Sequence, residues 1–374
     1  MKTKTLLLLL YIAVLLLTSA CDVIEDYIES NNYYEYKEEP APDTSQSPLL
    51  KGDVYGSEGT AAEATGGYPI PDFTLPIFSL DSIWNTSIEL NAPIDPESDA
   101  MIERLILEHE QGANMDLSVD EWSVTVFFAY EDTPRMNVEL IQYWWSYYLA
   151  IKDAPMPSEV VPDPEDDGHL AIIDLSDGYV YEFWQAEKRA DGTWTASWGN
   201  RIALSSNGIY PTGNSSRGSG FASLAGMIWP EEFAQGKIEH ALVVSIPSTK
   251  KGGPVPPATE SDGRSSYWGA IPIGARIQLN PALDLDGYDL TSYERTICEC
   301  LQEYGAFVGD TSGSIEFEAI NPLSYTHDPY NGMFNERWIV LHNIPLEELR
   351  VLELPPEIKD PELGVEDESI FVMP

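Results

Sequence analysis

The alternation of apolar and polar residues along the chain predicts many short strands and few helices. Residues 122–130 place Trp, Val, Val, Phe and Tyr at every second position, the pattern of a half-buried strand. Residues 168–184 form two β-rich runs around Asp177 and Gly178, a pair typical of a tight hairpin turn. Residues 237–246 form another apolar run, which we interpret as a partner strand of this hairpin.

Two stretches carry apolar residues at helical spacing. The first follows Asp95, the expected N-cap, with Pro96 at the first helical position. The second has Thr291 and Glu294 as a capping box and ends at Gly305. Other short strands are expected at residues 193–198, 201–204, 271–279, 307–308, 315–317 and 338–341. The pattern predicts a mainly β fold, a β-sandwich or jelly-roll with a few peripheral helices.

The hairpin has two alternative registers with different consequences. A two-residue turn at Asp177–Gly178 pairs Ile173 with Glu182 and places His169, Glu182 and Trp184 on one face. A three-residue loop would move Glu182 to the face of Asp174 instead. The turn residues favour the first register.

The N-terminus has the layout of an export signal. Lys2 and Lys4 precede an apolar run at residues 6–17, which is too short for a permanent membrane span. Small residues and Cys21 follow, an arrangement that resembles a bacterial lipobox, although Thr18 stands where leucine is usual. We therefore expect attachment to the cell envelope through a lipidated Cys21, or extracellular release if an ordinary signal peptidase cleaves after Ala20.

The composition divides the chain into four parts. Residues 1–20 are the expected signal peptide, and residues 21–70 form an acidic segment with little periodicity, expected to be a disordered tether. Residues 71–354 are expected to form a single β-rich domain. Residues 355–374 are acidic and proline-bearing, and we expect a loose tail.

The formal net charge of −42 limits the partners of the protein. Sixty-two carboxylates against twenty Lys and Arg argue against binding to nucleic acid or to an anionic membrane surface. This excess is compatible with a structural calcium ion but places none, and no cofactor or catalytic metal follows from it. Residues 201–276 are the exception, with seven basic and five acidic residues, so an anionic substrate group is conceivable there.

Three residues are candidates for acid/base catalysis or metal binding: His169, Glu182 and His240. A pair of histidines with a carboxylate can do either kind of chemistry if the fold brings the three together. A buried structural histidine is the alternative for each. The candidate substrate contacts are Asn207, in a long Gly/Ser/Asn loop at residues 205–220, together with Arg276 and Trp184.

Other features have a structural and a functional interpretation. The aromatic block at residues 143–148 is either core or a platform on which sugar rings stack. Cys298 and Cys300 stand two apart on the second helix, so they cannot bridge each other, and two small buried residues are favoured over a metal pair. The chain contains no Gly-x-Ser-x-Gly, P-loop, dinucleotide or His-Glu-x-x-His motif.

Several short motifs together resemble a family of secreted bacterial proteins to which no activity is assigned. The resemblance spans residues 78–320, except residues 107–150, which depart from the pattern. The motifs are Trp84-Asn85, Asp95-Pro96-x-Ser98, Gly168-His169 with Asp174, Tyr181-Glu182, Ser206-Asn207, Gly236-x-Ile238-x-His240-Ala241-Leu242, Gly274-x-Arg276, Tyr304-Gly305 and Asp310-x-x-Gly313. The resemblance implies a secreted, single-domain β protein and no particular reaction.

Two functions are consistent with these features. The first is a surface-tethered protein that acts on or binds extracellular polysaccharide as a lyase or hydrolase. The second is a non-catalytic envelope lipoprotein that binds glycan or protein through an aromatic surface. They differ in whether His169 and His240 share a carboxylate and in whether aromatic side chains are exposed.

Overall fold

The structure is a computed structural model that describes residues 77–141, 148–334, 338–361, 364–365 and 367–373. All of them fall in one unit of the chain, Gln46–Pro374. The expected signal peptide, Cys21, the acidic tether and residues 143–147 of the aromatic block lie outside the described residues.

The largest sheet has seven strands and mixes parallel with antiparallel pairs. In spatial order its strands are β14 (Ile339–Val340), β1 (Met115–Ser118), β13 (Ile315–Glu318), β10 (Leu242–Ile246), β12 (Ala306–Thr311), β11 (Arg276–Leu279) and β15 (Leu349–Val351). The central strands β10 and β12 are parallel, so their carboxyl ends meet at one edge. Loops that follow such ends are a common place for ligand sites.

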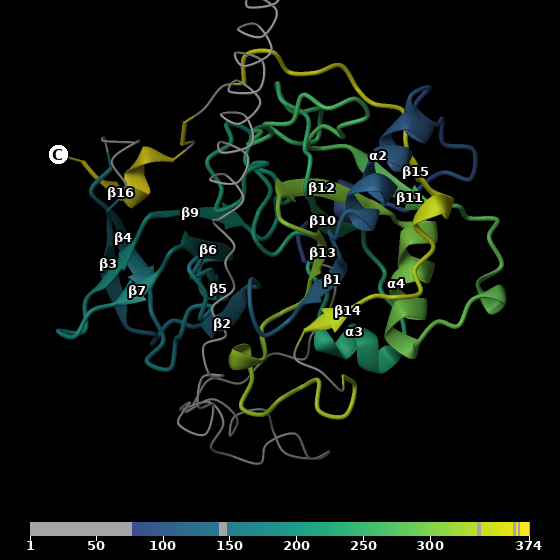
Figure 1. The fold of residues 1–374 in the computed structure, drawn as a ribbon. Coiled ribbons are helices and arrows are strands. Elements are labelled where there is room, and N and C mark those ends of the chain that lie inside the picture. The colour runs from purple at the N-terminus through teal and green to yellow at the C-terminus, as the bar shows by residue number, and fades with distance from the viewer. Residues whose placement is uncertain (1–76, 142–147, 335–337, 362–363, 366, 374) are drawn as a thin grey trace, which may run out of the picture. The chain divides into compact units, whose positions relative to one another are not determined.

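Two smaller sheets complete the β structure of the described residues. The four-stranded sheet has the order β2 (Thr125–Ala129), β5 (Leu170–Asp174), β6 (Tyr179–Trp184) and β9 (Trp198–Ala203). The five-stranded sheet has the order β16 (Phe371–Val372), β4 (Ala150–Pro155), β3 (Arg135–Leu140), β8 (Trp194–Ala196) and β7 (Glu187–Lys188). With few helices beside these sheets, the expected mainly β, sandwich-like fold is confirmed (Figure 1).

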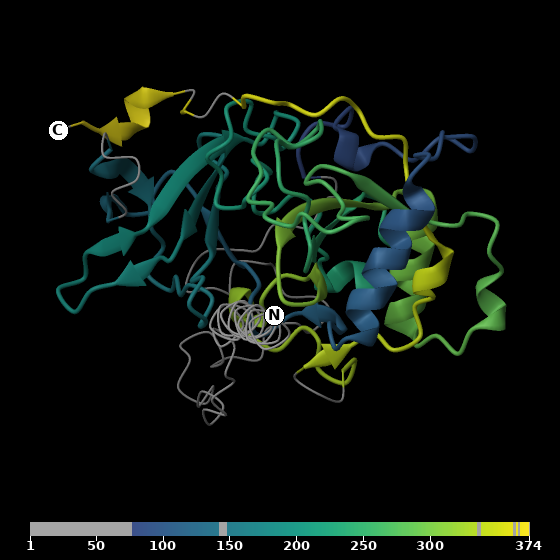
Figure 2. The same ribbon diagram turned by 45° about the horizontal axis from the view of Figure 1, so that its top comes forward.

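Three α-helices lie beside the seven-stranded sheet: α2 (Ser98–Glu110), α3 (Pro230–Gln235) and α4 (Ser292–Glu303) (Figures 1 and 2). Helix α4 begins with the predicted capping box, in which Thr291 and Glu294 bond each other's backbone. Helix α2 begins later than predicted. Asp95 caps a turn before it by accepting from Glu97 N at 2.8 Å.

The four-stranded sheet is buried on both faces, because it lies between two hydrophobic cores. Val126, Ala171 and Val180 belong to the larger core, whereas Phe127 and Ile172 belong to the smaller one. The prediction that residues 122–130 form a half-buried strand is therefore wrong. Alternation in a sequence does not distinguish a solvated face from one that packs on a second layer.

The register of the central hairpin differs from the prediction, but the shared face is retained. Asp174 pairs with Tyr179, so the loop holds four residues instead of two, and Glu182 lies opposite Ala171 instead of Ile173. A shift by two residues keeps the parity of the pleat. Glu182 therefore still shares a face with Ala171 and Ile173, toward the larger core.

The run at residues 237–246 is not the hairpin's neighbour. Its strand portion, β10, pairs with β12 and β13 in the seven-stranded sheet, whereas β5 and β6 belong to the four-stranded sheet. Backbone pairing depends on long-range packing that local patterns do not encode. The expectation of direct pairing is therefore wrong.

The C-terminal residues, expected to be a loose tail, are bonded to the domain at several points. Strand β16 pairs with β4, and Phe371 is fully buried. Upstream, Gly364 O accepts from Thr212 and Asn214, and Glu357 accepts from Gly253 N. The segment thus crosses the loops at residues 205–220 and 250–268.

Candidate functional site

Glu182 holds the long Gly/Ser/Asn loop against the sheet. Its buried carboxylate accepts from Ser223 N at 2.6 Å, from Ser223 Oγ at 2.8 Å and from Ser216 N at 3.3 Å. Burial raises the pKa of Glu182, and these hydrogen bonds oppose the rise. A carboxylate with so many bonds to one loop positions that loop, which carries Arg217.

Arg217 is the centre of a buried polar layer between the four-stranded and the seven-stranded sheets. Both of its terminal nitrogens bond Glu318 at 2.7 Å, and one also bonds Ser223 O at 2.9 Å. Its charge also acts on Glu182 and Asp310. We call Glu182, Arg217, Asp310 and Glu318 the polar seam.

His169 lies beside the seam at the start of β5. Burial lowers the pKa of its imidazole, the charge of Asp167 opposes this, and Arg217 and Glu318 also act on it. Its Nδ1 atom is buried and has no hydrogen-bond partner. The structure therefore brings His169 and Glu182 to the same cation, Arg217.

His240 lies at a different place, beneath α3. Its Nε2 contacts Glu232 at 3.1 Å, and its Nδ1 contacts Ala241 O at 2.9 Å. Burial alone would lower the pKa of His240, but Glu232 outweighs that effect and the pKa is raised. The charged groups beside His169 are Asp167, Arg217 and Glu318. The described contacts thus give the two histidines no common carboxylate.

The predicted substrate contacts are engaged within the protein. Asn207 Oδ1 accepts from Ile209 N at 3.1 Å in a local turn. Arg276 donates to Tyr304 O and Thr86 O and lies over the ring of Phe307. Trp184 Nε1 donates to Asp167 at 3.1 Å, and its ring packs against the smaller core. These contacts describe structural roles for all three side chains.

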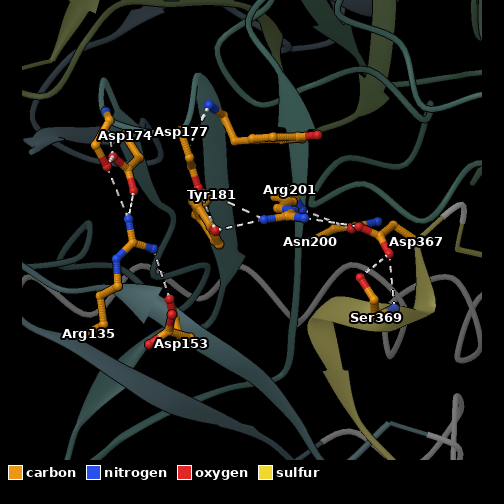
Figure 3. Close-up of polar contacts among 11 residues, drawn as sticks. Arg135, Asp153, Asp174, Asp177, Tyr181, Asn200, Arg201, Asp367 and Ser369 are labelled. Carbon is orange, nitrogen blue, oxygen red and sulfur yellow. Dashed lines mark hydrogen bonds and ion pairs between the residues drawn. The ribbon is translucent and has the colours of Figure 1, made fainter. Parts of the chain in front are cut away.

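A second polar network lies at the tip of the hairpin and is shown in Figure 3. Arg135 bonds Asp174, while Arg201 donates to Tyr181 at 3.0 Å and to Asp367 at 3.0 Å. In the view, the charged side chains point toward one another (Figure 3). The network therefore joins the hairpin to β3 and to the C-terminal segment. A depression of about 510 Å³ lies beside it, lined by Tyr130, Glu131, Leu175 and Ser176.

A pair of carboxylates that the sequence did not single out flanks Gly218, next to Arg217. A Cβ added to Gly218 would lie 2.9 Å from Asp262 Cγ and 2.9 Å from Asp310 Oδ1. Burial, followed by the charge of Asp262, raises the pKa of Asp310 well above its ordinary value, and Arg217 opposes the rise. The sequence signals were the long loop at residues 205–220, which carries Gly218, and the Asp310-x-x-Gly313 motif, but nothing in the chain order joined them.

The described ranges contain neither a metal-binding cluster nor a membrane-spanning helix. No group of three or more His, Cys, Asp or Glu there is arranged to hold a metal ion. None of the described helices has the length and apolar character needed to span a bilayer. Comparison of the chain with protein-family models, curated proteins and solved structures found no match.

Proposed function

We propose that this is an exported protein that binds extracellular polysaccharide through an exposed aromatic pair, Tyr267 and Trp268. The side chain of Tyr267 is 57% exposed and that of Trp268 is 66% exposed, in a chain whose other described aromatics are mostly buried. Adjacent exposed rings on a soluble protein indicate an interaction surface. Sugar rings present apolar faces that pack on such side chains, which combine apolar area with a polar edge.

The local structure holds the Tyr267 ring in a defined orientation beside Trp268. The guanidinium of Arg104, from α2, lies 4.4 Å from the centre of the Tyr267 ring. Tyr267 N donates to Ser265 Oγ, and Ala270 N donates to Tyr267 O. Gly269, at a φ of +78°, approaches Ala100 O so closely that a Cβ would lie 2.3 Å away. A pre-ordered platform loses less entropy on binding than a flexible loop does.

The charges around the platform favour a neutral glycan over a uronate. Five of the seven basic residues in 201–276 are engaged: Arg201 with Asp367, Arg217 with Glu318, Lys237 with Glu239, Lys250 with Glu357, and Arg276 with backbone oxygens. Lys251 and Arg264 remain exposed. Because four of these seven cations are paired with carboxylates, the local basic excess creates little attraction for a polyanion in a chain of −42. This argues against a uronate-specific lyase.

The test is binding of the mature chain to a panel of neutral and acidic polysaccharides, followed by affinity electrophoresis and calorimetry. Trp268→Ala should weaken binding at least about tenfold, since truncation of a central aromatic anchor costs about 2 kcal/mol or more. The matched control is Trp338→Ala, which removes another surface tryptophan, 36% exposed. An equal effect of both substitutions, or binding to protein partners or lipid vesicles alone, would argue against the proposal.

A further inference from the structure

The depression of about 510 Å³ at the hairpin tip lies at the carboxyl ends of two neighbouring parallel strands, β2 and β5. These strands end side by side, because Ala129 pairs with Asp174. The next residues along the chain, Tyr130 and Leu175, line the depression. Loops that follow such strand ends are a common place for ligand sites, and small-molecule pockets have volumes of about 300–1,000 Å³. The depression therefore has the place and the size of a ligand site.

Hydrogen bonds fix both walls of this depression. In the first wall, Tyr130 N donates to Thr133 Oγ1 at 2.8 Å, and Thr133 N donates to Tyr130 O at 3.0 Å. In the second wall, Ser176 donates to Asp174 Oδ1 through its N at 2.9 Å and through its Oγ at 2.6 Å. Asp174 is also paired with Arg135, whose side chain points toward it in Figure 3. Because the walls are fixed in advance, a ligand pays little conformational entropy to order them.

The side chains that line the depression combine one charge with apolar and hydroxyl groups. Tyr130 is half-buried, Leu175 is 43% exposed, and Ser176 contributes an exposed hydroxyl group. Of the four lining residues only Glu131 is charged, and its exposed carboxylate forms no ion pair with another described residue. Tyr130 and Leu175 offer apolar surface to the carbon atoms of a ligand, and an ionised carboxylate forms strong hydrogen bonds with a cationic donor.

The charges around the depression favour a positively charged ligand. The two guanidinium groups of the network at the hairpin tip are already engaged, in the pairs Arg135–Asp174 and Arg201–Asp367. The exposed carboxylates of Glu131 and its neighbour Asp132 have no such cation among the described residues. The net charge of −42 adds a field of the same sign over the whole surface. The depression therefore attracts a cation and repels an anion.

We propose that this depression binds an amino sugar. The protonated amino group donates a charge-assisted hydrogen bond to the Glu131 carboxylate, and the carbon ring lies against Tyr130 and Leu175. An ammonium group alone would use only a small part of the depression, and a neutral sugar would leave Glu131 without a partner. A ring that carries hydroxyl groups and an ammonium group matches the whole lining. Other residues form the aromatic platform at Tyr267 and Trp268, so this site does not depend on the proposed polysaccharide binding.

The test compares glucosamine with N-acetylglucosamine, which lacks the charged amino group, by calorimetry and NMR titration of the mature chain. At about pH 6, below the pKa of an amino group, glucosamine is a cation. It should bind at least about tenfold more tightly than N-acetylglucosamine, the contribution of one charge-assisted hydrogen bond. Glu131→Gln should remove this preference. The matched control is Glu110→Gln, which changes an exposed carboxylate on α2, beside the seven-stranded sheet, and should leave the preference intact.

Leu175→Trp provides a second variant, because it adds volume at an exposed wall of the depression and not in the core. It should block glucosamine binding in a folded protein. Equal binding of the two sugars, a preference that survives Glu131→Gln, or equally tight binding of the diamine putrescine would overturn the proposal. Glucosamine binding that is lost in Trp268→Ala would also overturn it, because the sugar would then lie on the platform. Polysaccharide binding without glucosamine binding would overturn this proposal alone and leave the proposed function intact.

Discussion

Arg217 shows how one buried cation organises several acidic residues. It forms two bonds of 2.7 Å with Glu318, and its charge reaches Glu182 and Asp310, which come from different strands. Each of these carboxylates would be costly to bury alone. Arg217 therefore links the four-stranded sheet to the seven-stranded sheet through charge, and not only through apolar packing.

Arg217→Met should destabilise the protein by about 3–5 kcal/mol, because it leaves Glu318 buried without its partner. Arg217→Met combined with Glu318→Leu should recover part of this loss. Removal of Arg189, which pairs with Glu139 at the surface with both side chains about half exposed, should cost less than about 1 kcal/mol. Urea denaturation measures all three, and an equal effect of the buried and surface changes would contradict the prediction.

At the scale of elements, the C-terminal strand β16 is an integral part of the five-stranded sheet. Phe371 lies 4.3 Å from the ring centre of Tyr148 and 5.8 Å from that of Trp198. Lys152 Nζ donates to Ser369 O, and Arg201 pairs with Asp367. The tail looks polar in sequence because acidic residues and prolines precede its apolar run at residues 370–373, yet Ile370 and Phe371 from this run complete the smaller core.

Phe371→Ala should lower stability by about 3–5 kcal/mol, as expected when a buried aromatic side chain is replaced by a small one. Met373→Ala is the control, because its side chain is 42% exposed two residues later. Thermal and urea denaturation provide the measurement. If the two variants were equally stable, the burial of Phe371 would contribute little to the stability of the fold. The C-terminal segment would then be loosely attached, as its composition suggests.

The hairpin and the helices show where local patterns succeed. The Thr291–Glu294 capping box formed as predicted, because its hydrogen bonds involve neighbours in sequence. The face that Glu182 shares with Ala171 and Ile173 was also predicted correctly, although the loop is two residues longer. Trp184, which was expected on the same face, packs against the smaller core instead. The start of α2 and the burial of β2 were predicted incorrectly, because the packing of segments distant in sequence decides both.

For the molecule as a whole, stability should fall as the pH rises from about 5 to about 9. Burial raises the pKa of Glu316 to about 8 and that of Asp163 to about 7, so the folded state binds protons that the unfolded state has lost. The raised pKa of His240 acts in the same direction, because its ion pair with Glu232 is lost as His240 deprotonates. The pKa values of Glu294 and Asp367 are lowered, so these groups act in the opposite direction. The stability that they contribute is lost only as the pH falls below the ordinary pKa of a carboxyl group.

Urea denaturation between about pH 5 and pH 9 tests whether the free energy of unfolding falls as the pH rises. Glu316→Gln should remove a few kcal/mol of the decline between about pH 4.5 and pH 8. A parallel series at high salt separates the general repulsion of a chain with a net charge of −42, which salt screens, from the buried groups, which salt affects less. A stability that stays level or rises toward pH 9 would show that these carboxyls are not protonated in the fold.

The sequence by itself determined the β-rich class, the capped second helix and the face that Glu182 shares with Ala171 and Ile173. Each depends on periodicity or on hydrogen bonds between near neighbours. Only the tertiary structure decided which histidines and carboxylates meet. It separated His240 from His169, left Asn207 and Arg276 in structural contacts, and brought Asp262 beside Asp310. The reason is that these contacts join strands and loops that are far apart in the chain. The burial and the neighbouring charges that set the pKa values of these side chains exist only in the folded protein.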